Sequence, residues 1–161
     1  MNDKKQIKFG RFAFEKCFVF PDDVEKFIPY LFLRLKIIER SICHICCGES
    51  KIGGFRIDKE PSMKPDLVAD VLDLPTILGC NTQKHILIDI PWVIDYNSRR
   101  KFAYALRDIL KPNGYLIINA PYSLWCKGLS WYDSPDFEVW KVIQNFNSYR
   151  DLVDFWVFKK L

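Results

Sequence analysis

The stretch 41–75 constrains the fold of this chain most strongly, because it places a loop of small residues between two short apolar runs. The first run, 42–47, breaks at Gly48, and the second, 54–57, ends on Asp58. Such a pattern is typical of a parallel α/β sheet that binds a nucleotide-like ligand. Glycine lets backbone N–H groups approach the ligand, and the carboxylate accepts hydrogen bonds from a ribose diol. We therefore predict a ligand site where these two strands end.

The loop itself argues against a dinucleotide. Residues 48–53 read Gly-Glu-Ser-Lys-Ile-Gly, which is not the GxGxxG fingerprint, and no helix fits between this loop and Gly54. The pyrophosphate of a dinucleotide would therefore lack the helix N-terminus on which it usually rests. The sequence disfavours NAD as a ligand.

Hydrophobic periodicity predicts that strands and helices alternate over residues 42–119. The runs 86–88 and 115–119 are unbroken, as in strands that are buried on both faces of a sheet. Between them, apolar residues at helical spacing follow Ser98, a candidate N-cap, and the helix should end at 111–114. This alternation predicts an α/β fold with a mainly parallel sheet.

The segment before the first strand is predicted to be helical over 22–40. Asp22 is a suitable N-cap, and Pro29 should kink this helix or start it anew. A length of 161 residues suits a single domain. We expect an N-terminal arm and helix in 1–40 and the α/β core in 41–161.

Two further strands are expected after the core alternation. Residues 137–143 and 152–159 are apolar segments joined by polar turn residues, which favours an antiparallel pair. The segment 76–84, with Gly79 and Asn81 as turn residues, is predicted to be irregular.

Composition limits the classes of function. A net charge of +4 excludes a diffuse basic surface, and 49% hydrophobic residues indicate a packed globular domain. Neither a signal peptide nor a long apolar run is evident, so we expect a soluble, cytoplasmic protein without a membrane partner. In such a compartment the six cysteines favour buried thiols over disulfides.

A metal site is not expected at the cluster of Cys43, His44, Cys46 and Cys47. If 42–47 is a strand, successive side chains point to opposite faces, so the thiols and the imidazole cannot converge on one ion. The structural alternative, buried cysteines in a strand, accounts for them.

The motifs of the central stretch also resemble a known family. They are Cys46-Cys47-Gly48-x-Ser50-x-Ile52-Gly53, then Arg56-Ile57-Asp58, then Ala69-Asp70-Val71-x-Asp73-Leu74-Pro75. In this order they resemble small, mostly archaeal class I S-adenosylmethionine-dependent methyltransferases. The resemblance continues at Asp89-Ile90-Pro91-Trp92 and at 110–114, and it covers about half of the chain, from 42 to 122.

The resemblance implies a Rossmann-like sheet with helices on both faces and a C-terminal antiparallel strand pair. It also implies S-adenosylmethionine as the cofactor. Asp58 would accept bonds from the ribose hydroxyls, Asp70 would accept the adenine amino group, and the loop around Gly48 would approach the methionine portion. The implied cofactor-binding residues are Cys47, Gly48, Glu49, Ser50, Asp58, Asp70 and Val71. The structural alternative is that each acid only ends a strand or caps a turn.

The segment Asp89-Ile90-Pro91-Trp92 resembles the (D/N/S)PP(Y/F/W) motif of methyltransferases that act on amines, with Ile90 in place of the first proline. These four residues are the candidate catalytic set. An acceptor side chain and a backbone carbonyl would hold the amine hydrogens while the aromatic ring stacks on a planar base. Alternatively, Pro91 and Trp92 simply end a strand and pack.

The resemblance thus predicts methylation of an exocyclic amine on a nucleic-acid base, in DNA or RNA. Lys51, Arg56, Arg99 and Arg100 are candidate phosphate contacts, although such residues are commonly just solvated. Sequence specificity would come from a partner, from a homo-oligomer or from the aromatic arm 4–20. The alternatives are a methyltransferase acting on a small molecule or protein, and an inactive methyltransferase-like binding or assembly subunit.

Overall fold

A computed structural model describes residues 7–8, 22–89, 96–121, 137–147 and 152–161. Its helices are α1 (Asp22–Leu35), α2 (Leu74–Leu78) and α3 (Tyr96–Ile109), with short 3-10 turns η1 (Glu39–Ser41), η2 (Pro61–Met63) and η3 (Val71–Asp73). Its strands are β1 (Ile7–Lys8), β2 (Ile42–Ile45), β3 (Phe55–Asp58), β4 (Leu67–Val68), β5 (Gln83–Asp89), β6 (Leu110–Pro121), β7 (Phe137–Asn147) and β8 (Leu152–Lys160).

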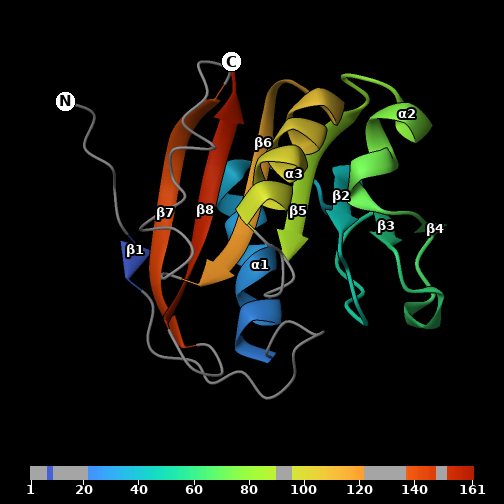
Figure 1. The fold of residues 1–161 in the computed structure, drawn as a ribbon. Coiled ribbons are helices and arrows are strands. Elements are labelled where there is room, and N and C mark those ends of the chain that lie inside the picture. Colours follow the sequence, from blue (N-terminus) through green and yellow to red (C-terminus); the bar gives the residue numbers. More distant parts are fainter. Residues whose placement is uncertain (1–6, 9–21, 90–95, 122–136, 148–151) are drawn as a thin grey trace.

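The strands form one sheet in the order β1-β7-β8-β6-β5-β2-β3-β4. Strands β2 to β6 pair in parallel, whereas β8 is antiparallel to both β6 and β7. The arrowheads of β2, β3 and β5 therefore point to the same edge of the sheet (Figure 1). The predicted fold class, a mainly parallel sheet with a C-terminal antiparallel strand pair, is confirmed.

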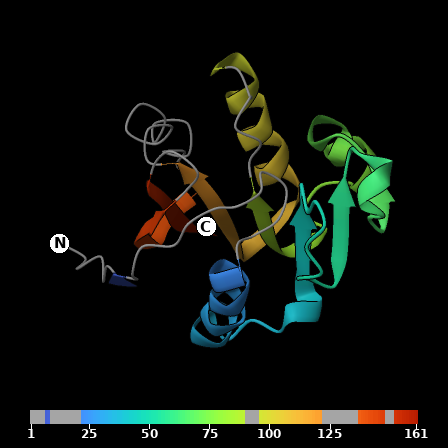
Figure 2. The ribbon, with the colours of Figure 1, turned by 90° about the horizontal axis from the view of Figure 1, so that it is seen from below.

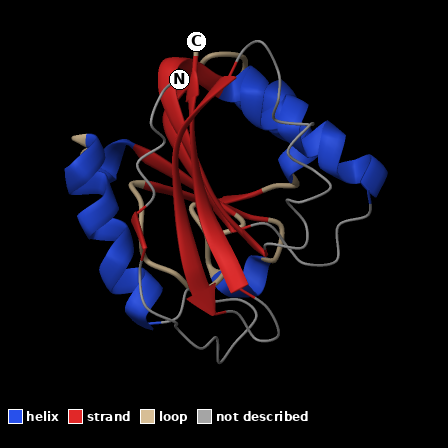
Figure 3. Ribbon diagram, turned by 90° about the vertical axis from the view of Figure 1, so that its left-hand side faces the viewer, coloured by secondary structure: helices blue, strands red, loops and turns tan. Residues whose placement is uncertain are grey.

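Helices cover both faces of the sheet, as predicted (Figure 3). Alternate residues of a buried strand serve opposite faces. In β2, Ile42 packs in the core beneath α1, whereas Cys43 and Ile45 pack in the core beneath α2 and α3. The unbroken apolar run in β5 has the same cause: Ile86 and Ile88 are buried on the α3 side and Leu87 on the α1 side. None of the helices in the described part of the chain is long and apolar enough to cross a membrane.

Helix α1 ends at Leu35, five residues earlier than the predicted 40, and it continues through Pro29. Lys36 adopts a left-handed conformation (φ 56°), and the amide of Ile37 reaches back to the carbonyl of Phe32 at 2.8 Å. This is a Schellman ending, which usually has glycine at the left-handed position. A lysine there gave the sequence analysis no stop signal.

Three other predicted boundaries also differ. Helix α3 begins at Tyr96, so Ser98 lies inside it and is not its N-cap, and the segment 76–84 contains the end of α2 and the start of β5. Residues 111–114 do not separate helix from strand, because β6 begins at Leu110 and the turn forms a bulge within that strand. The left-handed residue of this turn is Asn113, with a φ of 62°, and not Gly114.

The connections β2–β3 and β3–β4 contain no α-helix. Residues 46–54 form a loop that is longer than the predicted 48–53, because β2 ends at Ile45 and β3 begins at Phe55, and residues 59–66 contain only the turn η2. Among the described residues, α1 is consequently the sole helix on its face of the sheet, and Figure 2 shows it below the centre of the sheet, away from β3 and β4. Ile52 packs in the core beneath α1 and Cys46 packs against the core beneath α3, and polar contacts hold other parts of the two loops.

Lys160, at the end of β8, holds the C-terminal end of α3. Its ammonium group donates to the carbonyl oxygens of Arg107 (2.6 Å) and Leu110 (2.7 Å) and to Oδ1 of Asn81 (3.0 Å). A cation that satisfies carbonyls at a helix C-terminus is favoured by both hydrogen bonding and the helix dipole.

Replacing Lys160 by methionine should lower the free energy of unfolding by about 2 kcal/mol, because carbonyl groups lose a charged donor. Urea denaturation would measure the change. Lys101→Met, on an exposed position of α3, is the control and should change stability by less than about 0.5 kcal/mol. Equal effects of the two substitutions would contradict the proposal that the Lys160 ammonium group stabilises the C-terminal end of α3.

Candidate functional site

The loop between β2 and β3 lies at the carboxyl edge of the sheet, where ligands bind in open α/β folds. It turns sharply because Cys46 and Gly48 both adopt left-handed backbone conformations, with φ of 53° and 52°. Further along, Gly53 has a φ of 102° and lies against the Cβ of His44 and the backbone of Ile42. The loop thus depends on glycine at two of its turns.

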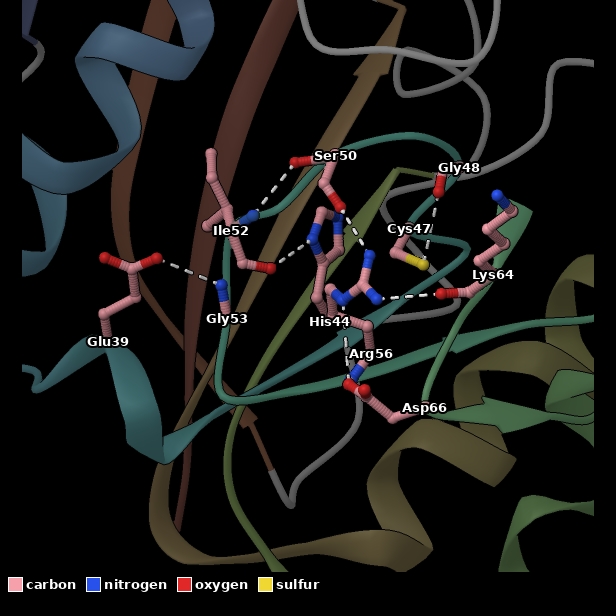
Figure 4. Close-up of polar contacts among 10 residues, drawn as sticks. All are labelled: Glu39, His44, Cys47, Gly48, Ser50, Ile52, Gly53, Arg56, Lys64 and Asp66. Atoms are coloured by element: carbon pink, nitrogen blue, oxygen red, sulfur yellow. Dashed lines mark hydrogen bonds and ion pairs between the residues drawn. The ribbon is translucent and has the colours of Figure 1, made fainter.

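Side chains from outside the loop hold its backbone at four positions. Asp58 accepts from the amide of Gly48 (2.8 Å), and Arg56 donates to the carbonyl of Ser50 (3.2 Å). His44 Nδ1 bonds to the carbonyl of Ile52 (2.9 Å), and Glu39 accepts from the amide of Gly53 (3.2 Å). Figure 4 shows the last three contacts converging on the loop from β2, β3 and η1. The loop is therefore held in one conformation without a helix behind it.

Asp58 ends β3 and lies beside Gly48, as the sequence predicted. Its Oδ2 accepts from Gly48 and its Oδ1 from the amide of Glu60 (3.0 Å). A carboxylate has about four lone-pair positions, so two remain for further donors. The half-buried carboxylate is suited to accept hydrogen bonds from a ribose diol.

Asp70 lies near Asp58, after the neighbouring strand β4. Val68 pairs with Asp58 in the sheet, and the amide of Ala69 donates to the Asp58 carbonyl at 3.0 Å. Asp70 Oδ1 accepts from Leu72 (2.9 Å) and so caps η3, while the carboxylate stays exposed. Asp70 therefore caps a turn, as the structural alternative proposed, and its exposed carboxylate has lone pairs left for other donors.

The remaining predicted cofactor residues differ in where they point. Ser50 is buried and its Oγ accepts from the Ile52 amide (3.3 Å), so the hydroxyl serves the loop itself. The Cys47 thiol is also buried and lies 3.5 Å from the Gly48 carbonyl, whereas Glu49 is exposed. Val71 is buried in the core as the first residue of η3.

The predicted catalytic segment is described only at its start. Asp89 is the last residue of β5, which neighbours β2, and it pairs with Asn119 of β6. Asp89 thus belongs to the same edge of the sheet as Asp58. Ile90, Pro91 and Trp92 lie outside the described residues.

The polar residues that hold the loop were largely missed by the sequence analysis. The sequence makes Arg56 a candidate phosphate contact, but its guanidinium bonds to loop carbonyls and its side chain is only 15% exposed. The sequence places His44 in a cysteine-rich strand and gives it no partner. An ionisable residue inside an apolar strand was the available signal, because burial requires such a group to have a partner.

No group of three His, Cys, Asp or Glu side chains that could hold a metal ion occurs within the part of the chain that the structure describes. Burial is the main cause that raises the pKa of the Cys43 thiol to about 12, and the neighbouring Cys47 adds a smaller effect. Burial is also the main cause that raises the pKa of the Cys47 thiol to about 11, and the negative charge of Asp58 adds to it. Both thiols are protonated at neutral pH and are poor nucleophiles.

Two histidines are kept neutral by the fold. Burial lowers the pKa of His44 to about 4, although the bond to Ile52 opposes this shift. Burial, with a smaller effect of Lys84, lowers the pKa of His85 to about 4. His85 Nδ1 accepts from the amide of Tyr115 (3.1 Å), and the two rings stack with their centroids 5.5 Å apart. A carbonyl only accepts, so His44 carries its proton on Nδ1, whereas His85 Nδ1 is unprotonated.

These shifts predict a pH-dependent stability. Between pH 6.5 and about 4 the unfolded chain binds protons that folded His44 does not, so stability is complete above 6.5 and falls as the pH drops toward 4. The loss for one such histidine is about 3 kcal/mol. Urea denaturation at several pH values would measure it. His44→Asn keeps a hydrogen-bond donor near the position of Nδ1 but does not titrate. The slope of its unfolding free energy against pH should therefore decrease by the contribution of one proton. An unchanged slope would show that His44 does not cause the pH dependence.

Comparison with known proteins gives the fold a name. No family model and no curated protein matches the chain. Solved structures do: a S-adenosylmethionine-dependent methyltransferase from Clostridium acetobutylicum ATCC 824 has a TM-score of 0.62 at 9% identity, covering 84% of this chain and 90% of that one. N-methyltransferase NodS from Bradyrhizobium japonicum WM9 has a TM-score of 0.59 at 13% identity, covering 86% and 97%.

A nucleic-acid enzyme is also among the similar structures. A variant of the 16S rRNA (adenine(1408)-N(1))-methyltransferase from Catenulisporales acidiphilia, with cosubstrate SAM, has a TM-score of 0.52 at 12% identity, covering 74% of this chain and 85% of that one. The chain therefore has the class I methyltransferase fold. At these identities the likeness establishes the architecture only.

Proposed function

We propose that the chain is an S-adenosylmethionine-dependent methyltransferase that methylates an amino nitrogen, most specifically an exocyclic amine of a nucleic-acid base. The observation that carries the proposal is the 2.8 Å hydrogen bond between Asp58 and Gly48. It joins the end of β3 to the loop that follows β2, at the ligand-binding edge of a methyltransferase fold, and leaves carboxylate lone pairs for a diol.

The described residues fit this cofactor. Asp58 would hold the ribose hydroxyls, Asp70 the adenine amino group, and the backbone around Gly48 the methionine portion, with Val71 beside the adenine. S-adenosylmethionine would supply an electrophilic methyl group on a sulfonium sulfur. Cys47 and Ser50 would act through the loop conformation, since their side chains are buried within it. Glu49 is exposed and free to face the ligand.

The acceptor would be held by the segment that follows β5. The Asp89 carboxylate and the carbonyl of residue 90 would accept the two amine hydrogens, and Trp92 would stack on the base. Pro91 would restrict the backbone of the segment. So held, the amine would direct its lone pair at the methyl carbon that S-adenosylmethionine supplies; the new C–N bond would replace the C–S bond of the cofactor, and the released proton would pass to solvent. Positioning, and not a strong base, supplies the rate.

Two similar folds support nitrogen as the acceptor. The names of the Bradyrhizobium and Catenulisporales proteins both specify methylation at nitrogen, the latter at the ring nitrogen N1 of an adenine of rRNA. The motif that starts at Asp89 is what favours an exocyclic amine over a ring nitrogen. DNA and RNA remain equal candidates as the source of the base.

The test has two stages. Calorimetric titration should detect micromolar binding of S-adenosylmethionine to the wild-type protein. A labelled methyl donor should then label RNA or DNA in the presence of the protein, and Asp89→Ala should abolish transfer while binding of the cofactor persists. Cofactor binding with labelling of small amines or proteins alone would reassign the substrate. If the folded protein did not bind S-adenosylmethionine, the proposal of an enzyme would be refuted. The alternative of a binding or assembly subunit would then be the one to pursue.

A further inference from the structure

Arg56 lies where the two helix-free connections of the sheet meet. It is in the middle of β3 and pairs with His44 of β2, on the α1 side of the sheet but beyond the part that α1 covers (Figures 2 and 4). The loop 46–54 passes one side of its side chain and the segment 59–66 passes the other.

Its guanidinium binds both connections at once. Nη1 donates to the carbonyl of Ser50 (3.2 Å) and Nη2 to the carbonyl of Lys64 (2.8 Å). Nε lies 3.6 Å from Oδ2 of Asp66, and the same oxygen accepts from the Arg56 amide at 2.8 Å. One planar cation thus joins positions that are six and eight residues away in the sequence.

The contact to Ser50 has a direct consequence for the turn at Gly48. The amide of Ser50 donates to the Cys47 carbonyl at 3.0 Å, so residues 47–50 form a closed turn. Arg56 fixes the last carbonyl of this turn, and Asp58 fixes the Gly48 amide inside it. Removing the guanidinium would release one end of the turn while Asp58 still held its middle.

We infer that Arg56 is a positioning residue that sets the conformation of the loop 47–50 for the methionine end of the cofactor. The inference rests on the proposed function. Arginine is required because its rigid fork reaches two carbonyls in different directions, whereas a lysine ammonium is a single point. The role is indirect: the donors of Arg56 are turned toward the loop backbone and Asp66, not toward a ligand.

The experiment compares two ligands that differ only at the end that this loop would contact. S-adenosylhomocysteine carries the amino-acid portion, and 5′-methylthioadenosine lacks it. Arg56→Met should weaken binding of S-adenosylhomocysteine about tenfold while changing that of 5′-methylthioadenosine less than about threefold. Arg56→Lys, which keeps the charge, should recover only part of the affinity for S-adenosylhomocysteine. It replaces Arg56→Met in the experiment if the methionine variant fails to fold. Arg107→Met is the matched control, since Arg107 pairs with Asp108 on α3 away from the loop.

Amide hydrogen exchange of the ligand-free protein tests the same role without a cofactor. Exchange at Ser50, Ile52 and Gly53 should be at least about tenfold faster in Arg56→Met and unchanged in Arg107→Met. Unchanged exchange in Arg56→Met would overturn the inference, as would equal weakening of both ligands. If the wild-type protein bound neither ligand, the proposed function would fail, whereas the exchange result would still decide whether Arg56 holds the loop.

Discussion

Replacing Gly54 by alanine is expected to destabilise the protein by about 3 kcal/mol or more, the upper range for overpacking. A Cβ at this position would overlap the carbonyl oxygen of Arg40, which is backbone and cannot rotate away. The amide of Gly54 is also bonded to the Ile42 carbonyl (3.0 Å), so the loop cannot move off without losing that bond. The close approach lies where the loop passes the start of β2.

Urea denaturation of Gly54→Ala measures the effect, and Gly79→Ala is its control. Gly79, unlike Gly54, has a positive φ of 80°, and the nearest atom to an added Cβ would be 3.7 Å away, on Thr82. The control should therefore cost only backbone strain, of order 1–2 kcal/mol. If Gly54→Ala were as stable as Gly79→Ala or more stable, the prediction would be wrong, and the backbone at Arg40 would have to move to make room for the added Cβ.

Asp58→Asn is expected to weaken S-adenosylmethionine binding about 100-fold, since the diol loses charged acceptors and the turn at Gly48 loses one of its ties. The wild-type carboxylate accepts backbone N–H groups on both oxygens. In asparagine an NH₂ group replaces one of the two oxygens. The amide of Gly48 or that of Glu60 would then face another donor instead of an acceptor. Stability should also fall, by about 1–3 kcal/mol. Calorimetry and urea denaturation separate the two effects.

Asp108→Asn is the matched control for that substitution. Asp108 also accepts hydrogen bonds with its carboxylate, from the Arg107 guanidinium, but it lies on α3, away from the loop. Its substitution should alter cofactor affinity by less than about threefold. Similar losses from the two variants would mean that Asp58 acts through charge alone.

The strand ends of the site were predictable because they follow from local patterns. An apolar run that stops at Gly48 and another that stops at Asp58 require no knowledge of distant residues. The same holds for β5, where three apolar residues precede Asp89. The antiparallel pairing of β7 and β8 also followed from two apolar segments and a polar turn.

The network around the loop was not predictable, because each contact joins elements that only the folded sheet brings together. Glu39 and Gly53 are 14 residues apart, and His44 and Ile52 are eight apart. No periodicity distinguishes an arginine that binds two carbonyls from one in solvent. Helix boundaries failed for a related reason: Lys36 takes a conformation for which glycine is the usual signal, because burial of Ile37 stabilises it there.

The position of β8 has a consequence for the order in which the sheet can be completed during synthesis. β8 separates β6 from β7, and β1 pairs only with β7 among the described strands. The sheet from β2 to β6, with its candidate site, can form as soon as residue 121 is available. β7 and β1 cannot join this part of the sheet until β8 has been synthesised through Lys160, because β8 lies between β6 and β7. The sheet is therefore completed only when β8 pairs with both neighbours.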